Sequence, residues 1–353
     1  MPKRRWPARS AGDNEGNEAM KAVKWGIVST ADIGVKKVIP AMLRAKGVEI
    51  AAIASRDESR AKAVAVKLGI PKSYGSYEAL LADPEIEAVY NPLPNHLHVP
   101  VTLQALAAGK HVLCEKPVAL TAAEAGQLTQ AAQKAGKLVA EAFMVRHHPQ
   151  WRRAREIAQS GKLGEVSLIA SLFSYYNVDP ANVRNQGDIG GGALYDIGCY
   201  PIVTARFVFG AEPVRVSAVM NRDETFGTDR LTSAIAEFPG GRHLIFSAAT
   251  QLVPRQHVQI MGTKGRLEVM IPFNAPPGQT TILRFDDGTD LSGRNIVAEV
   301  LPACDQYTLQ GEAFSAAVRG KVDLEFGLKD AILNMRVIDA MFAAAKSGKW
   351  EPV

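Results

Sequence analysis

Two short stretches carry residues that could move a proton, Glu115-Lys116-Pro117 and the run from Gly190 to Tyr200. The first follows the apolar residues 112–114, which are typical of a buried strand, and the proline ends that strand because it has no N–H to extend a ladder. Ligands of open α/β sheets bind just outside the carboxyl ends of strands, where burial and neighbouring charges shift the pKa of a lysine. Lys116 is therefore a candidate for proton chemistry; the alternative is a solvated lysine ahead of the next helix.

The second stretch puts an acid and a phenol on one helical face. Three glycines, Gly190 to Gly192, permit close backbone approach before the helix begins. Asp196 and Tyr200 are four positions apart and share a face, while Pro201 predicts a bend in the helix. A carboxylate and a phenol beside a glycine-rich opening indicate a substrate site, although a solvated aspartate and an amphipathic tyrosine are common. Together with Lys116 they favour the substrate site.

A dinucleotide site is indicated near the start of the chain. Residues 23–28 read as a strand, and the turn Ser29-Thr30-Ala31-Asp32-Ile33-Gly34 leads from it into an amphipathic helix. The usual G-x-G-x-x-G becomes Ser29-x-Ala31-x-x-Gly34 here, and small side chains still let the backbone approach a pyrophosphate at the helix N-terminus. A turn that binds no phosphate fits this stretch equally well.

The end of the second strand bears on the choice of cofactor. Residues 48–54 form the predicted strand, followed by Ser55 and Arg56, with Arg60 one turn into the next helix. An NAD site usually has an acid here for the ribose 2′-hydroxyl, whereas hydroxyl and arginine donors suit a 2′-phosphate. Asp57 is expected to cap the helix 58–68 instead. The pattern favours NADP over NAD.

Alternating strands and helices continue to about residue 146 and predict a parallel sheet. Residues 88–91 are a strand that runs into the loop from Pro92 to His98, which has two prolines and lies on the cofactor side. We reject His96 and His98 as a metal pair because no acid or cysteine cluster is nearby. The remaining predicted elements are a short strand and helix over 74–81, helices over 99–108 and 122–135, and strands over 111–116 and 137–144.

Strand-forming composition dominates after a helix predicted over 150–160. Gly240-Gly241 and Gly262 to Gly265 read as hairpin turns, so we expect a large, mainly antiparallel open sheet with helices on one face. The fold class is therefore α/β, a Rossmann domain (21–146) followed by an α+β substrate and oligomerisation domain (147–353), after a disordered tail (1–20). The predicted strands are 166–176, 214–220, 231–238, 243–249, 258–261, 267–271 and 280–285.

Composition narrows the function classes. The 353 residues are 47% hydrophobic and 22% charged, which fits a two-domain globular protein, and a net charge of +5 argues little for nucleic acid. No stretch has the length of an apolar membrane span. Cys114, Cys199 and Cys304 are far apart, so we expect free thiols in a reducing, cytoplasmic compartment.

These motifs, read in order, resemble the Gfo/Idh/MocA oxidoreductase family, and most closely its branch with glucose-fructose oxidoreductase, NADP-dependent xylose dehydrogenase and dimeric dihydrodiol dehydrogenase. The resemblance implies that Lys116 is the catalytic lysine, that Tyr200 is the acid/base and that Asp196 binds or orients the substrate. It also implies a homo-dimer or homo-tetramer formed through the open sheet. By the same resemblance, the nicotinamide side is lined by Pro92, Asn95 and His96, with Glu115 and Arg146 nearby. The expected cofactor-binding residues also include Asn91 and Leu93.

The expected activity is NADP-dependent hydride transfer to or from a sugar or small polyol, as in an aldose 1-dehydrogenase of the D-xylose or D-glucose type. No metal is needed. A free phenol has a pKa of about 10, and we expect Lys116 to lower that of Tyr200. The alternatives are an NADPH-dependent reductase of a keto- or anhydro-sugar, a trans-dihydrodiol dehydrogenase, and a non-catalytic NADP-binding regulator.

Overall fold

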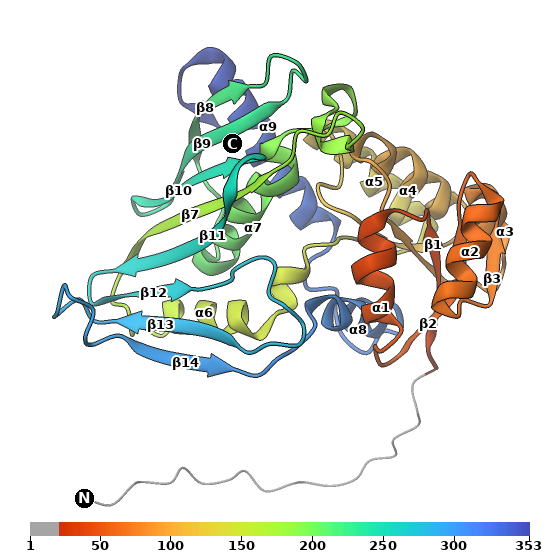
Figure 1. Ribbon diagram of the computed structural model, residues 1–353, viewed down its shortest axis with the longest axis horizontal. Helices are drawn as coiled ribbons and strands as arrows, with labels where there is room; N and C mark the ends of the chain where they lie inside the picture. Colours follow the sequence, from red (N-terminus) through yellow and green to blue (C-terminus); the bar gives the residue numbers. More distant parts are fainter. Residues whose placement is uncertain (1–20) are drawn as a thin grey trace, which may run out of the picture.

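The computed structural model describes residues 21–353, and the tail expected over residues 1–20 lies outside this range. Two β-sheets, each with its own helices, lie beside one another (Figure 1). Within residues 21–353, no helix combines the length and the apolar character needed to cross a bilayer.

The first sheet is six-stranded and entirely parallel, as predicted. From β1 the chain builds outward on one side through β2 and β3, then crosses to build β4, β5 and β6 on the other. The change of direction between β1 and β4 is the topological switch point at which such sheets bind ligands. In spatial order the strands are β3 (Lys72–Tyr74), β2 (Val48–Ala54), β1 (Val23–Val28), β4 (Ala88–Asn91), β5 (His111–Cys114) and β6 (Val139–Glu141).

Helices cover both faces of this sheet. The N-cap predicted at Asp57 is present, since its carboxylate accepts from the backbone N–H of Arg60 at 3.1 Å. The helical elements that follow the strands are η1 (Gly34–Val38), α1 (Ile39–Met42), α2 (Glu58–Leu68), α3 (Tyr77–Ala82), η2 (Asn95–Leu97), α4 (His98–Ala107) and α5 (Ala122–Ala135).

One helix on this sheet comes from the far end of the chain. In α8 (Gln306–Val318), Phe314 packs on Trp25 of β1 with ring centroids 5.3 Å apart, and the Trp25 indole N–H donates to Ser315 Oγ at 3.1 Å. Arg319, just beyond α8, donates to both carboxylate oxygens of Glu87 at 2.7 Å. The core of the N-terminal sheet is therefore completed by C-terminal residues.

The second sheet has nine strands, antiparallel except where β7 and β10 run parallel at its centre. One face is covered by α6 (Pro149–Gln159), α7 (Cys199–Phe209) and α9 (Leu328–Ser347), and the other is open (Figure 1). The strands in spatial order are β14 (Val297–Leu301), β13 (Thr281–Asp286), β12 (Gly265–Val269), β11 (Gln251–Gly262), β7 (Val166–Tyr176), β10 (Arg242–Ala249), β9 (Asp229–Phe238), β8 (Arg215–Arg222) and β15 (Glu351–Pro352).

Two differences from the sequence prediction concern prolines. Strand β11 begins at Gln251 rather than Val258, because its first half contains Pro254 and a register shift against β7 that hide the strand pattern. Pro201 lies in α7, three residues after a π-helical turn, η6 (Leu194–Gly198), and the helical backbone continues from η6 into α7. The irregularity beside this proline is therefore a wider helical turn just ahead of it. The short helices η3 (Met144–His147), η4 (Val183–Asn185) and η5 (Gly187–Ile189) complete the chain.

Candidate functional site

A cavity of about 1270 Å³, here called the cleft, opens at the carboxyl ends of β1, β4 and β5. Its opposite wall includes β7 and the start of β11 from the second sheet, together with the helical elements η4, η5, η6 and α7. Lys116, Asp196 and Tyr200 all line it, so residues far apart in the sequence meet as predicted. The two walls are joined directly, since the Asn95 side-chain amide donates to the carbonyl oxygen of Gly190 at 2.8 Å.

An ion-pair network holds the lysine in place. Lys116 Nζ lies 3.1 Å from Asp196 Oδ1 and also donates to the Asp196 carbonyl oxygen. The other carboxylate oxygen, Oδ2, accepts from the Tyr175 hydroxyl at 2.7 Å and from Arg184 Nε at 2.9 Å. Asp196 therefore fixes Lys116 and is itself fixed by one residue of β7 and one of η4.

Burial and charge oppose one another in this network. Burial disfavours the charge of Asp196, yet Lys116 and Arg184 together hold its pKa well below the usual range. Burial likewise disfavours the charge of Lys116, but the Asp196 carboxylate outweighs it and the pKa of Lys116 is raised. Lys116 is consequently an ammonium group at neutral pH, able to donate hydrogen bonds but not to accept a proton.

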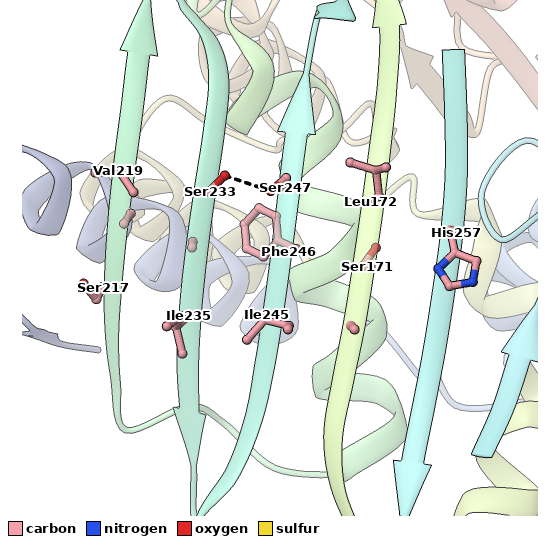
Figure 2. Close-up of a pocket in the computed structure, with 13 residues that line it drawn as sticks. Ser171, Leu172, Ser217, Val219, Ser233, Ile235, Ile245, Phe246, Ser247 and His257 are labelled. Atoms are coloured by element: carbon pink, nitrogen blue, oxygen red, sulfur yellow. Dashed lines mark hydrogen bonds between the residues drawn. The ribbon is translucent and has the colours of Figure 1, made fainter. Parts of the chain in front are cut away.

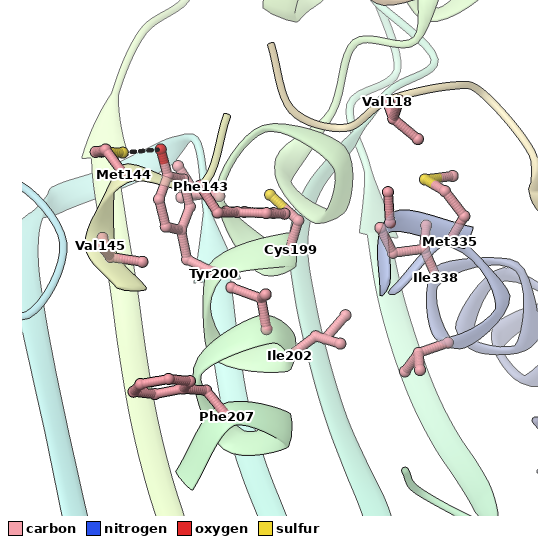
Figure 3. Packing of buried hydrophobic residues seen from close by; sticks show 14 of the residues in the cluster. Val118, Phe143, Met144, Val145, Cys199, Tyr200, Ile202, Phe207, Met335 and Ile338 are labelled. Carbon is pink, nitrogen blue, oxygen red and sulfur yellow. Dashed lines mark hydrogen bonds between the residues drawn. The ribbon is translucent and has the colours of Figure 1, made fainter. Parts of the chain in front are cut away.

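Tyr200 lies in an aromatic cage against the cleft. Its ring makes edge contacts with Phe143 and Phe173, at centroid distances of 5.4 and 5.8 Å, and its hydroxyl points to Met144 Sδ at 3.6 Å (Figure 3). Lys116 Nζ lies over the ring, 5.1 Å from its centroid. Burial raises the pKa of Tyr200 well above 10, so the expectation that Lys116 lowers this pKa is wrong: the cation faces the ring while the low-dielectric cage disfavours a phenolate.

The turn after β1 has the backbone shape of a dinucleotide fingerprint. Ser29 adopts a φ of 107°, a conformation that favours glycine and costs another residue about 1–2 kcal/mol. Its Oγ accepts from the Ala31 N–H at 3.0 Å, which stabilises the turn. Because Ala31 lines the cleft with only a methyl group, the turn leaves room for a pyrophosphate, and this wall fits a dinucleotide.

Most of the predicted cofactor residues line the cleft: Ala31, Asp32, Ile33, Arg60, Pro92, Leu93, Asn95, Glu115 and Lys116. Ser29, Thr30, Ser55 and Asn91 are buried at the strand ends behind them. Asn91 shapes the next loop, since its amide donates to the His98 carbonyl oxygen and accepts from the Leu93 N–H. Arg56 is exposed and His96 half-buried, and neither is part of the cleft wall.

Arg146 lies elsewhere. It is 2% exposed, pairs with Asp330 of α9 and stacks on Phe326, with its guanidinium carbon 3.9 Å from the ring centroid. Asp330 also accepts from Arg206 of α7 at 3.0 Å. The structure therefore puts Arg146 in a buried network that joins the halves of the molecule, not at the nicotinamide side, because its side chain turns toward α9.

Comparison with known proteins decides the family. The family model described as "Oxidoreductase family, NAD-binding Rossmann fold" matches residues 23–143, and that described as "GFO/IDH/MocA C-terminal domain" matches residues 151–268. The chain belongs to the Gfo/Idh/MocA family of oxidoreductases.

Individual relatives cover nearly all of this Gfo/Idh/MocA chain. An uncharacterized oxidoreductase of Rhizobium meliloti is 48% identical over 95% of the chain and 100% of its own length. D-xylose 1-dehydrogenase (NADP(+)) 2 of Haloferax volcanii is 41% identical over 92% of the chain and 98% of its own length. The solved structure of KijD10, a 3-ketoreductase from Actinomadura kijaniata in complex with NADP and TDP-benzene, matches this chain with a TM-score of 0.86 and 31% identity. The match covers 92% of this chain and 98% of KijD10.

Some residues of this Gfo/Idh/MocA site escaped the sequence analysis. Tyr307 of α8 reaches the cleft from the C-terminal helices, and no motif marks it. Lys36 and Lys37 line the cleft beside Arg60, and their place just after the fingerprint turn was a usable signal. Tyr175 and Arg184 belong to none of the motifs described above, and both contact Asp196.

Proposed function

We propose that this oxidoreductase is NADP-dependent and acts on a sugar or small polyol, as an aldose 1-dehydrogenase of the D-xylose or D-glucose type. The observation that carries the proposal is the meeting of Lys116, Asp196 and Tyr200 in one cleft with the fingerprint turn. Free thiols at all three cysteines support a reducing compartment, the cytoplasm.

The polar lining of the cleft supports a polyhydroxylated substrate. Five carboxamide side chains line it together with Arg184 and Arg255, and carboxamides both donate to and accept from hydroxyl groups. A site of this kind rejects analogues that lack the matching hydroxyl, because its polar groups would be left unpaired. The carboxamides are Asn95, Asn177, Asn182, Gln256 and Asn274.

In the proposed mechanism, bound NADP supplies the hydride chemistry at its nicotinamide ring. Two of the three N–H donors of Lys116 are directed at Asp196 within residues 21–353, so the third is available to the reacting oxygen and stabilises charge that develops on it. Tyr200 exchanges the proton of that oxygen, as base in oxidation and acid in reduction. Its weak contact with Met144 leaves the hydroxyl free to rotate toward the substrate.

The solved relatives support these roles. Structures of KijD10 variants with one lysine or one tyrosine replaced are also similar to this chain, at TM-scores of 0.82 and 0.86. In that reductase the two replaced residues lie as many positions apart as Lys116 and Tyr200 do here.

A second candidate is an NADPH-dependent reductase of a keto-sugar, and the state of Tyr200 favours it. Because burial raises the pKa of this phenol, the hydroxyl stays protonated at neutral pH and is ready to donate in reduction. The same group must first lose a proton to serve as base in oxidation. The two candidate functions use the same site residues and differ in the direction of hydride transfer.

The deciding experiment follows absorbance at the reduced-nicotinamide band with aldoses, keto-sugars, anhydro-sugars and dihydrodiols, each with NADP, NADPH, NAD and NADH. Turnover of an aldose with NADP supports the dehydrogenase, and oxidation of NADPH by a keto-sugar supports the reductase. Intact cofactor binding without turnover of any substrate would contradict both.

The preference for NADP rests on the end of β2. Asp57, the first acid after β2, is engaged by the helix it caps and by Ser59, whose hydroxyl donates to it at 2.6 Å. Arg60 lines the cleft and reaches the Thr30 carbonyl oxygen at 3.4 Å. Arginine without a free acid is the arrangement that suits a 2′-phosphate.

We expect Arg60→Ala to weaken NADP binding about 10-fold or more and NAD binding less than about threefold, because one charge-assisted hydrogen bond is worth roughly 1.5–3 kcal/mol. Arg56→Ala should act in the same direction. Cofactor fluorescence titration measures both constants, and Lys67→Ala, an exposed lysine of the same helix, is the control. Equal losses for NADP and NAD would contradict the 2′-phosphate contact.

We further propose that two copies associate through the open sheet face. Apolar side chains project from neighbouring strands there, around a shallow cavity of about 550 Å³ (Figure 2). Val219 is 73% exposed, Ile235 40% and Ile245 39%, and a face of this kind is typical of an interaction surface. Ser233 and Ser247 bond to each other at 2.7 Å across the same face, which pairs two of its polar side chains.

Ile235→Asp should convert the oligomer to monomers, because it buries an unpaired carboxylate in the interface. Light scattering after size exclusion measures the mass, and Val66→Asp, at a 77% exposed position on α2, is the matched control. A wild-type protein that is monomeric at tens of micromolar would contradict the proposal.

A further inference from the structure

We propose that His98 and Glu141 are positioning residues for Lys116, holding from two sides the backbone that directly follows it. The inference rests on the role proposed above for Lys116. Its side-chain end is fixed by Asp196, so the remaining freedom is that of the loop which carries it.

His98 holds the carbonyl side of this loop. The ring is fully buried at the start of α4, with Nδ1 2.7 Å from the Pro117 carbonyl oxygen and Nε2 2.7 Å from that of Leu93. Both neighbours are acceptors, so a neutral ring donates to one of them in either tautomer. The proposal places the ring proton on Nδ1, so that His98 donates to the Pro117 carbonyl oxygen. Leu93, which lines the cleft, lies against the other edge of the ring.

Glu141 holds the amide side. It ends β6, is 3% exposed, and its Oε1 accepts from the Val118 N–H at 2.8 Å. Its Oε2 has no partner among residues 21–353. Burial raises the pKa of Glu141 to about 8, so the side chain is a neutral acid at neutral pH. An apolar residue would fill the same space without this desolvation, which indicates that the acceptor is what the position requires.

The two contacts act on consecutive residues. Pro117 is held through its carbonyl oxygen and Val118 through its N–H, by side chains from different elements. Lys116 therefore projects from a segment with little freedom, and the reach of its ammonium group to the substrate oxygen is set before any ligand arrives. A misplacement of about 1 Å can cost a reaction about 100-fold, so the effect should appear in kcat.

Paired substitutions separate positioning from packing. Glu141→Leu removes the acceptor, whereas Glu141→Gln keeps an oxygen at the same place. The amide nitrogen of asparagine can take the place of Nδ1 and that of glutamine the place of Nε2. His98→Asn therefore keeps the bond to Pro117, whereas His98→Gln donates to Leu93 instead.

We expect Glu141→Leu and His98→Gln to lower kcat at least 10-fold with the sugar KM and the NADP affinity within about twofold of wild type. Glu141→Gln and His98→Asn should retain most activity. Circular dichroism and thermal melts confirm folding. Wild-type kcat in folded Glu141→Leu, or equal losses in Glu141→Leu and Glu141→Gln, would overturn the proposal.

A second readout is independent of turnover. Labelling with an amine-directed reagent, followed by peptide mass spectrometry, reports how firmly Lys116 is held against Asp196. Glu141→Leu and His98→Gln should label Lys116 several-fold faster than wild type, with Lys67 unchanged. If the wild-type protein turns over no substrate, the proposed function fails, but the labelling rate of Lys116 still tests whether His98 and Glu141 position it. Unchanged labelling of Lys116 in both variants would overturn the positioning proposal.

Discussion

Lys116→Ala is expected to lower kcat by about 10³-fold while NADP binding stays within a fewfold of wild type. The ammonium group is the donor aimed at the reacting oxygen, and alanine removes it without replacing its charge. The fold should persist because Asp196 keeps Arg184 at 2.9 Å and the Tyr175 hydroxyl at 2.7 Å. The carboxylate is then still paired, so it is not left as an uncompensated buried charge.

The measurement combines steady-state kinetics with a cofactor titration on the same preparation. Lys67→Ala, on the exposed face of α2, controls for loss of a positive charge. Activity within 10-fold of wild type would remove the lysine from the mechanism. A parallel loss of NADP affinity would instead mean that Lys116 serves the cofactor.

Tyr200→Phe should reduce kcat by about 10²–10⁴-fold and leave the melting temperature nearly unchanged. Phenylalanine keeps the ring contacts with Phe143 and Phe173 and loses only the hydroxyl, whose one hydrogen bond within residues 21–353 is to Met144 Sδ. Tyr176→Phe is a matched control, because this tyrosine at the end of β7 is 64% exposed and does not line the cleft.

The second prediction also includes the direction in which the rate of reduction changes with pH. A general acid works in its protonated form, so the rate of reduction should hold as pH rises until the pKa of Tyr200 is passed. Burial raises that pKa above 10, and the plateau should extend through the physiological range. A reduction rate that already falls near pH 8 would mean that the phenol is far more acidic than its cage allows.

The sequence predicted the N-terminal sheet closely. The strands over 23–28, 48–54 and 88–91 and the helices over 58–68 and 122–135 have their predicted bounds. Fully buried parallel strands and capped helices leave local signals in composition, so no long-range information was needed. The exposed edge strand β14 and the two-residue β15 were missed because a strand that borders solvent has no such signal.

The sequence predicted three residues that meet in the cleft, but it did not predict the directions of the side chains around them. Lys116, Asp196 and Tyr200 were found because each belongs to a recognisable motif. Which way a side chain turns depends on partners distant in sequence. Asp330, far down the chain, draws Arg146 away from the cleft, and three aromatic rings close around Tyr200 and raise its pKa. The spacing of residues within a motif predicts neither the direction of the Arg146 side chain nor the surroundings of Tyr200.

The packing of α8 on β1 bears on how this protein can be divided. A fragment that stops near residue 146 would contain every strand of the dinucleotide-binding sheet, yet it would lose Phe314 and Ser315 and lay Trp25 open to water. Trp25 is among the largest fully buried side chains of the molecule. The nucleotide-binding half is thus built from two separate parts of the amino-acid sequence, and the intact chain should unfold in one cooperative transition.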